Sequence, residues 1–122
     1  MATHQIGKTR TFLAGEDLSS AQYHFVTLES DGFVDIATDG ATCIGVVLNT
    51  PASGEAATVA LDGRVLVEAG GNIAVGAAVA SNATGEAITA ATADVIMGYA
   101  MEAGVDGQII AIELIQGGNA AA

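Results

Sequence analysis

The sequence has no tryptophan, one proline, one cysteine and only three basic residues among its 122. The single cysteine, Cys43, excludes an internal disulfide and a cysteine-rich zinc site. Three bases against 14 acids give a formal net charge of -11, which argues against a nucleic-acid-binding surface, because phosphate binding requires clustered Lys and Arg. No apolar run approaches the roughly 18 residues of a membrane-spanning helix, and no apolar segment of a secretory signal follows Lys8 and Arg10. We therefore expect a protein with no nucleic-acid or membrane partner, made in a reducing cytoplasm.

The abundant residues are small and apolar. Hydrophobic residues make up 51% of the chain, aromatic residues only 4%, and there are 16 glycines. A disordered chain of this charge would be far less apolar, so we expect one folded domain with a core of Val, Ile, Leu and Ala. A core so poor in aromatic side chains is only marginally stable alone, and this favours self-association.

Charge is distributed unevenly along the chain. Residues 1–15 carry +2, whereas the remainder contains all 14 acids and a single base. The first segment also lacks a clear apolar period, and the last residues are rich in Gly and Ala. We therefore predict an extended N-terminal arm at 1–17, a β domain at 18–115 and a flexible tail at 116–122.

The sequence contains an internal repeat. Residues 21–61 align with residues 74–114 without a gap, and seven of the aligned pairs are identical. The identical pairs are Ala21/Ala74, Val26/Val79, Gly32/Gly85, Ala37/Ala90, Gly45/Gly98, Gly54/Gly107 and Leu61/Leu114. Coincident glycines with apolar stretches between them indicate two pseudo-repeats of one fold.

Short apolar segments separated by turn signals indicate β-strands. Asp-Gly pairs, typical of hairpins because Gly reaches positive φ without steric cost, occur at 31–32, 39–40, 62–63 and 106–107. Strands of about five residues at this spacing predict an all-β fold, a compact small sandwich or barrel built from two pseudo-repeated β-meanders. Residues 64–68 alternate and predict a strand that bridges the copies.

The second copy contains an ambiguous segment. Residues 87–101 are Ala-rich and are compatible with a helix, because short apolar runs do not reveal their period. Gly98 would cost such a helix about 1 kcal/mol. If the two copies share a fold, 94–101 forms a strand.

One motif suggests a nucleotide site. Residues 2–9 read Ala-Thr-His-Gln-Ile-Gly-Lys-Thr and fit a relaxed phosphate-binding loop, with Ala in the place of the first glycine. A true loop of this kind leads into a helix whose N-terminal N–H groups hold the phosphates. Residues 10–20 show no helical period, so we expect no nucleotide cofactor.

The remaining candidates for site chemistry are also weak. The soft ligands His4, His24 and Cys43 are too widely separated in the chain for a zinc motif, and we expect His24 at the surface or an interface. Acids recur every fourth residue at Asp31, Asp35 and Asp39, whereas a calcium loop needs them at alternate positions. We therefore predict no catalytic, cofactor-binding or metal-binding residue, and no enzymatic activity.

Three stretches, taken in order, resemble a known family. They are Ala41–Val59, which begins Ala-Thr-Cys-Ile-Gly-Val-Val-Leu-Asn-Thr-Pro; Gly63–Gly76, with Arg-Val-Leu-Val-Glu-Ala-Gly-Gly-Asn; and Ile96–Ala103, followed by Gly107 and the 109–114 segment. Together they resemble the small capsid decoration, or cement, proteins of tailed bacteriophages over roughly residues 18–115.

This resemblance implies a β-rich structural protein without catalytic residues, placed on the outer surface of the virion capsid and made in the host cytoplasm. It implies two partners: the major capsid protein, whose neighbouring subunits such proteins bridge and stabilise, and further copies of the chain in a homotrimer at threefold and local threefold positions. The alternatives are a nucleotide-dependent recombinase-type subunit and a repeat-built fibre or adhesin module.

The N-terminal arm departs most from the family pattern but carries a candidate contact. Lys8 and Arg10 are the only bases before Arg64, and Phe12 and Leu13 follow them directly. A short segment without helical period gains little by folding on itself, so we expect a partner to order it. We predict that Lys8, Arg10, Phe12 and Leu13 contact the capsid or a neighbouring protomer.

Overall fold

A computed structural model describes residues 5–115, and within this range the chain forms strands and no helix. No segment of the described residues forms a helix that could cross a membrane. The strands are β1 (Gln5–Ile6), β2 (Thr9–Leu13), β3 (Phe25–Leu28), β4 (Val34–Ile36), β5 (Gly45–Val47), β6 (Ala56–Ala60), β7 (Gly63–Glu68), β8 (Ala78–Ser81), β9 (Ala87–Thr89), β10 (Gly98–Ala100) and β11 (Ile109–Leu114). The predicted all-β class is confirmed.

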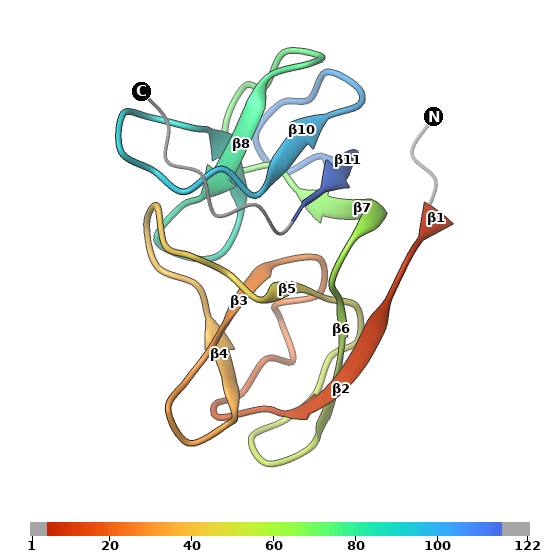
Figure 1. The fold of residues 1–122 in the computed structure, drawn as a ribbon, viewed down its shortest axis with the longest axis vertical. Coiled ribbons are helices and arrows are strands. Elements are labelled where there is room, and N and C mark those ends of the chain that lie inside the picture. The colour runs from red at the N-terminus through yellow and green to blue at the C-terminus, as the bar shows by residue number, and fades with distance from the viewer. Residues whose placement is uncertain (1–4, 116–122) are drawn as a thin grey trace.

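The strands form two antiparallel sheets, one in each half of the molecule (Figure 1). The N-terminal sheet has the order β2-β6-β5-β3-β4, and the C-terminal sheet has the order β1-β7-β11-β10-β8-β9. In the first copy β5 returns beside β3 rather than beside β4, and in the second β10 returns beside β8. Each half therefore differs in this connection from a simple meander.

The two halves repeat strand for strand. The offset that aligns Ala21 with Ala74 also places β3, β4 and β5 on β8, β9 and β10 with the same bounds, and places β6 within β11. The pairing follows the same offset: Val26↔Ile36 becomes Val79↔Thr89, and Val47↔Val59 becomes Ala100↔Ile112. The sequence repeat is therefore a repeat of hydrogen-bonding register as well as of strand order.

The segment 64–68 has a role that its alternation did not reveal. It lies in β7, which pairs with β11 as β2 pairs with β6: Val65 faces Ile112, and Arg10 faces Val59. This strand is thus the second copy's counterpart of β2, with Val65 equivalent to Arg10. In the ambiguous segment, β9 and the short β10 exclude a helix.

Two clusters of buried apolar side chains form the core of the protein. One lies within the N-terminal half and is made of Ala14, Leu18, Ala21, Val26, Val34, Val47, Ala57 and Val59. The other fills the C-terminal half and extends to the opposite face of the N-terminal sheet, where Phe25, Val46 and Ala60 are fully buried. Phe25 is the largest of the fully buried side chains, so one aromatic ring joins the two halves.

The N-terminal segment is extended, but the expectation that only a partner could order it is wrong for residues 5–13. In Figure 1 this segment runs along one side of both halves. β1 pairs with β7 in the C-terminal sheet, and β2 pairs with all of β6 in the N-terminal sheet. The missing apolar period has a simple reason: every residue of β2 except Phe12 is exposed, since this is an edge strand.

Two chain segments pass from one sheet to the other side by side: residues 7–8, between β1 and β2, and residues 61–62, between β6 and β7. The N–H of Gly7 donates to the carbonyl of Asp62 at 3.1 Å, and the N–H of Leu61 donates to the carbonyl of Lys8 at 2.8 Å. The backbone N–H of Lys8 also donates to Oδ1 of Asp62 at 2.8 Å. The segment is therefore clamped where it passes from one sheet to the other. The parts of the predicted arm and tail at 1–4 and 116–122 lie outside the described residues.

Candidate functional site

The four predicted contact residues divide into two groups. Lys8, Arg10 and Leu13 are exposed, with Leu13 at 44%, whereas Phe12 is half-buried and packs against the core of the N-terminal half. Phe12 lies opposite the fully buried Ala57 across the β2–β6 ladder. The structure therefore brings three of the four to an accessible edge and uses the fourth in the chain's own packing.

That edge has an unpaired side. β2 is the outermost strand of the N-terminal sheet and β1 the outermost strand of the C-terminal sheet, so in the described part of the chain each pairs on one side only. An edge strand presents a row of backbone donors and acceptors to which another chain can add a strand. We name this edge, residues 5–13, the N-terminal edge.

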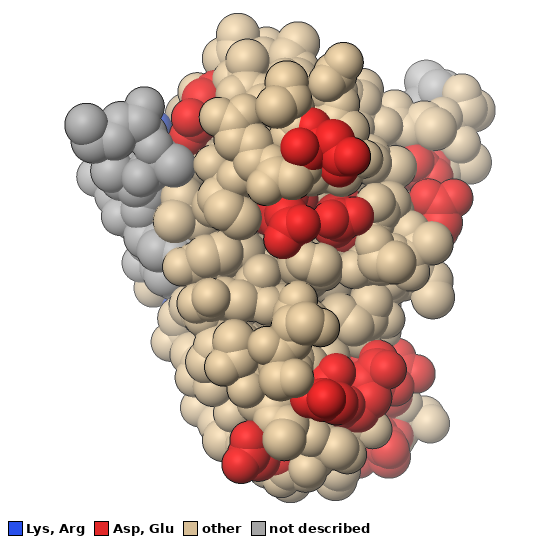
Figure 2. Space-filling view, turned by 180° about the vertical axis from the view of Figure 1, so that it is seen from behind, with Lys and Arg blue, Asp and Glu red and all other residues tan. Residues whose placement is uncertain are grey.

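The N-terminal edge also gathers the positive charge. Arg64 of β7 lies directly opposite Gln5 of β1, so all three bases of the chain lie along this side. Within residues 5–115, Lys8, Arg10 and Arg64 form no ion pair. Figure 2, a view from behind, shows acidic side chains over both halves and blue only at one margin. A basic edge on an acidic body gives the molecule an asymmetric charge distribution. Such an asymmetry orients the molecule as it approaches a charged partner and so steers association.

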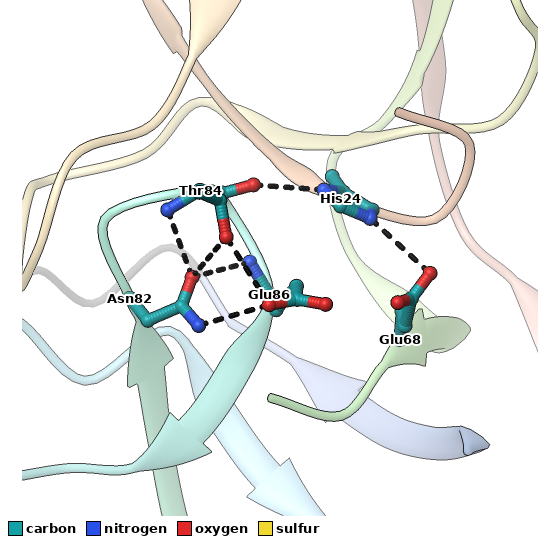
Figure 3. Close-up of polar contacts among 5 residues, drawn as sticks. All are labelled: His24, Glu68, Asn82, Thr84 and Glu86. Atoms are coloured by element: carbon teal, nitrogen blue, oxygen red, sulfur yellow. Dashed lines mark hydrogen bonds and ion pairs between the residues drawn. The ribbon is translucent and has the colours of Figure 1, made fainter. Parts of the chain in front are cut away.

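A second polar arrangement lies at the junction of the halves (Figure 3). His24, just before β3, is only 9% exposed. It was expected at the surface or at an interface, and the first of these two expectations is wrong. Its Nδ1 lies 2.8 Å from the carbonyl oxygen of Thr84, and its Nε2 lies 3.3 Å from Oε1 of Glu68. With Glu86, these two side chains form a trio whose nitrogen and carboxylate oxygens all lie within 4.8 Å of one another. We call His24, Glu68 and Glu86 the junction trio.

Glu86 is held firmly in this arrangement. Its Oε1 accepts hydrogen bonds from Nδ2 of Asn82 and Oγ1 of Thr84, both at 3.1 Å, and the other carboxylate oxygen points toward Glu68 in Figure 3. Burial raises the pKa of Glu86, but the hydrogen bonds with Asn82, Glu68 and Thr84 and the nearby His24 outweigh it and hold the pKa below its ordinary value.

Sequence reasoning missed the junction trio because its members come from distant parts of the chain. No local spacing rule connects residues at such separations. The repeat contained a usable signal, however. The counterparts of His24, Glu68 and Glu86 in the other copy are Ala77, Leu13 and Phe33, all apolar.

The other sequence candidates do not form sites. The phosphate-loop-like motif leads into β2, so among the described residues it has no helix to hold a phosphate. Asp31 lies in a turn, where its Oδ1 accepts the N–H of Phe33 at 3.0 Å. Cys43 is buried, and burial raises its pKa to about 12, so it is not a reactive thiol.

These features define an all-β protein with a basic edge that can present a strand to a partner. A family model described as phage cement protein matches residues 4–114. The chain therefore belongs to the phage cement protein family, and it is a capsid-associated phage protein. The resemblance found in the sequence is confirmed.

A solved structure has the same fold. It is described as the crystal structure of the head fiber gp8.5 N base in bacteriophage phi29. The identity is 18%, the TM-score is 0.73, and the alignment covers 93% of this chain and 98% of the other. No curated protein sequence matches the chain.

Proposed function

We propose that the protein is a non-enzymatic capsid decoration protein that binds the outer surface of the assembled head and stabilises it by bridging neighbouring subunits of the major capsid protein. The observation that carries this proposal is membership of the cement protein family over nearly the whole described chain. The N-terminal edge supports it, because a basic edge strand with one side unpaired gives a bridging protein both a backbone contact and a charge contact.

The charge distribution fits this role. The acidic body keeps the protein soluble and away from nucleic acid, whereas the edge with Lys8 and Arg10 can meet acidic groups on a partner. Exposed ion pairs contribute only about 0–1 kcal/mol each, so these bases act on orientation and association rate more than on affinity. Leu13, exposed beside them, supplies apolar contact area.

The edge hypothesis is tested on heads that lack the protein. The variants Lys8→Ala/Arg10→Ala and Leu13→Ser remove the exposed chemistry without removing β2, whereas deletion of residues 1–13 would remove a strand of the sheet. Leu28→Ser, at a similarly exposed leucine on β3, is the matched control. We expect the double variant to bind roughly 2–10-fold more weakly at low salt, with a flatter salt dependence.

Unchanged occupancy and unchanged salt dependence in both edge variants would place the capsid contact on the acidic body instead. Electron microscopy of heads with and without the protein tests the proposed position. We propose a homotrimer at threefold and local threefold positions, because the aromatic-poor core gains from burial between protomers. Single copies at general positions on the shell would contradict the trimer.

A second candidate is the base module of a head fibre. The observation that favours it is the shared fold with the phi29 head-fibre base over nearly the full length of both chains. A fibre base would carry a spike away from the shell, whereas a cement protein lies flat between capsid subunits. The same micrographs distinguish the two arrangements.

A further inference from the structure

The junction trio combines three features that a cation site requires. An imidazole nitrogen and two carboxylates approach within 4.8 Å of one another. They come from three separate places in the chain: the start of β3, the end of β7 and the turn before β9. His24 is nine-tenths buried and the two glutamates are half-buried, so all three ligand atoms are partly shielded from water.

The ring of His24 is oriented as in metal-ligating histidines. The carbonyl oxygen of Thr84, 2.8 Å from Nδ1, accepts a hydrogen bond from the N–H of that nitrogen and fixes the ring. Such a bond from one ring nitrogen to a backbone carbonyl directs the other nitrogen at the metal. In the neutral ring with a proton on Nδ1, the lone pair of Nε2 therefore faces Oε1 of Glu68 at 3.3 Å, and a cation between the two atoms would be bound by both.

The carboxylates need a positive partner as well. Glu68 and Glu86 approach each other closely, and within the described residues no Lys or Arg pairs with either. Two carboxylates this close to one another can both be ligands of one cation. A divalent cation beside a neutral imidazole balances their two charges.

The fold itself does not require polar residues at these positions. The other copy places Ala77, Leu13 and Phe33 at the equivalent sites and forms the same strands in the same register. A histidine and two glutamates at a partly buried junction cost stability unless the groups are paired. A ligand shared between the halves supplies that pairing.

The site is also reachable from solvent, because Glu68 and Glu86 are only half-buried and His24 lies at the edge of a pocket. His24 and Thr84 line an open pocket of about 300 Å³. Glu16 and Asp17 line the same pocket, and their charges raise the local concentration of cations at its mouth.

We propose that His24, Glu68 and Glu86 bind one divalent transition-metal cation, of the zinc class, which ties the two repeats together. Imidazole with carboxylate ligands suits Zn²⁺, Ni²⁺ and Mn²⁺, whereas Mg²⁺ and Ca²⁺ prefer sites made only of oxygen ligands. The remaining coordination positions are filled by water. The site acts on the stability of the domain and is independent of how the protein contacts a capsid.

The test uses the full-length protein after treatment with a chelator. Thermal unfolding is followed in a chelator-free buffer with added ZnCl₂, NiCl₂, MnCl₂ or MgCl₂, and bound metal is measured after gel filtration. We expect one equivalent of zinc and, at zinc about 100-fold above the dissociation constant, a rise in Tm of about 5 °C or more, with no rise for MgCl₂. The variants His24→Gln and Glu86→Gln should both lose the zinc and the rise in Tm.

Glu113→Gln, which removes an exposed acid of β11 outside the trio, is the control and should keep both. Glu86→Gln keeps an oxygen that can accept from Asn82 and Thr84, so it preserves the turn if His24→Gln fails to fold. Equal Tm shifts in all variants would mean diffuse binding to the acidic surface and would overturn the proposal. The absence of bound metal after gel filtration would also overturn it.

Discussion

Gly45 and Gly98, equivalent positions of the two copies, stand in the same relation to the strand beside them. A Cβ on Gly45 of β5 would overlap the backbone carbonyl oxygen of Ala60 in β6, and a Cβ on Gly98 of β10 would overlap that of Glu113 in β11. Ala60 and Glu113 are themselves equivalent in the repeat. Each half therefore needs a residue without a Cβ, a glycine, at one point of β5 or β10.

The first prediction follows from this contact. Gly45→Ala and Gly98→Ala should each destabilise the protein by about 1–3 kcal/mol, because the obstacle is backbone that cannot rotate away. Chemical denaturation of each variant measures the change. Gly71→Ala, where no atom lies within 4 Å of the added carbon, is the control and should leave stability unchanged or slightly raised. Equal effects at all three positions would show that glycine flexibility, and not the close approach, decides.

The second prediction concerns a mismatch between the copies. Gly40 has a φ of 67°, and its counterpart Ala93 has a φ of 73°, in the left-handed region that alanine adopts at a cost. Ala93→Gly should therefore raise the free energy of unfolding by about 0.5–1 kcal/mol despite the greater freedom of the unfolded chain. Ala83→Gly, at an exposed turn position without positive φ, is the control and should not stabilise. A loss of stability in Ala93→Gly would contradict the argument.

The repeat explains how much of the fold the sequence predicts. All four Asp-Gly glycines, Gly32, Gly40, Gly63 and Gly107, have positive φ, and the strands lie between them as expected. Turn chemistry is local, so a single sequence reveals it. The alignment of the two copies carried the same pattern into the Ala-rich second copy, where composition alone was also compatible with a helix.

The N-terminal edge and the junction trio were not predictable in the same way. β2 pairs with β6, a strand far along the chain, and its exposed edge position erases the alternation by which a strand is recognised. The junction trio depends on how the two halves pack. Neither a long-range pairing nor a docking geometry leaves a local trace.

The third prediction separates the two roles of neighbouring residues in β2. Phe12→Ala should destabilise the domain by about 1–3 kcal/mol, because its ring packs against the core of the N-terminal half. Leu13→Ala should change stability by less than about 0.5 kcal/mol, since the side chain is exposed. Thermal unfolding of both variants checks this. If Phe12→Ala were neutral, the ring would be free to contact a partner, as first expected from the sequence.

The fourth prediction uses Cys43 as a reporter of unfolding. The thiol is buried, and burial raises its pKa from 9.0 to about 12, so at pH 8 almost none of it is thiolate. Labelling with a thiol reagent should be at least roughly 100-fold slower in the native protein than in denaturant. Rapid labelling under native conditions would mean that the core around Cys43 opens often.

The last prediction concerns Asp35 of β4. Burial raises its pKa, and the charges of Glu16, Glu29 and Asp31 raise it further, while its buried Oδ1 has no hydrogen-bond partner among the described residues. A raised pKa means that the folded state binds this proton more tightly than the unfolded state does. The group therefore costs stability above its folded pKa, and the cost disappears as the pH falls toward the ordinary value of 3.8.

Asp35→Asn should accordingly raise Tm by roughly 1–3 °C at pH 7, because it removes the charge that the site disfavours and supplies an amide that can donate to the nearby carboxylates. The gain over the wild type should shrink as the pH is lowered from 7 toward 4, where the wild-type carboxyl takes up its proton. Asp39→Asn makes the same change in net charge at an exposed turn and separates the local effect from the general relief of a chain charged at -11. Equal gains in the two variants, or a difference that does not vary with pH, would show that net charge alone is responsible and that the environment of Asp35 has no special effect.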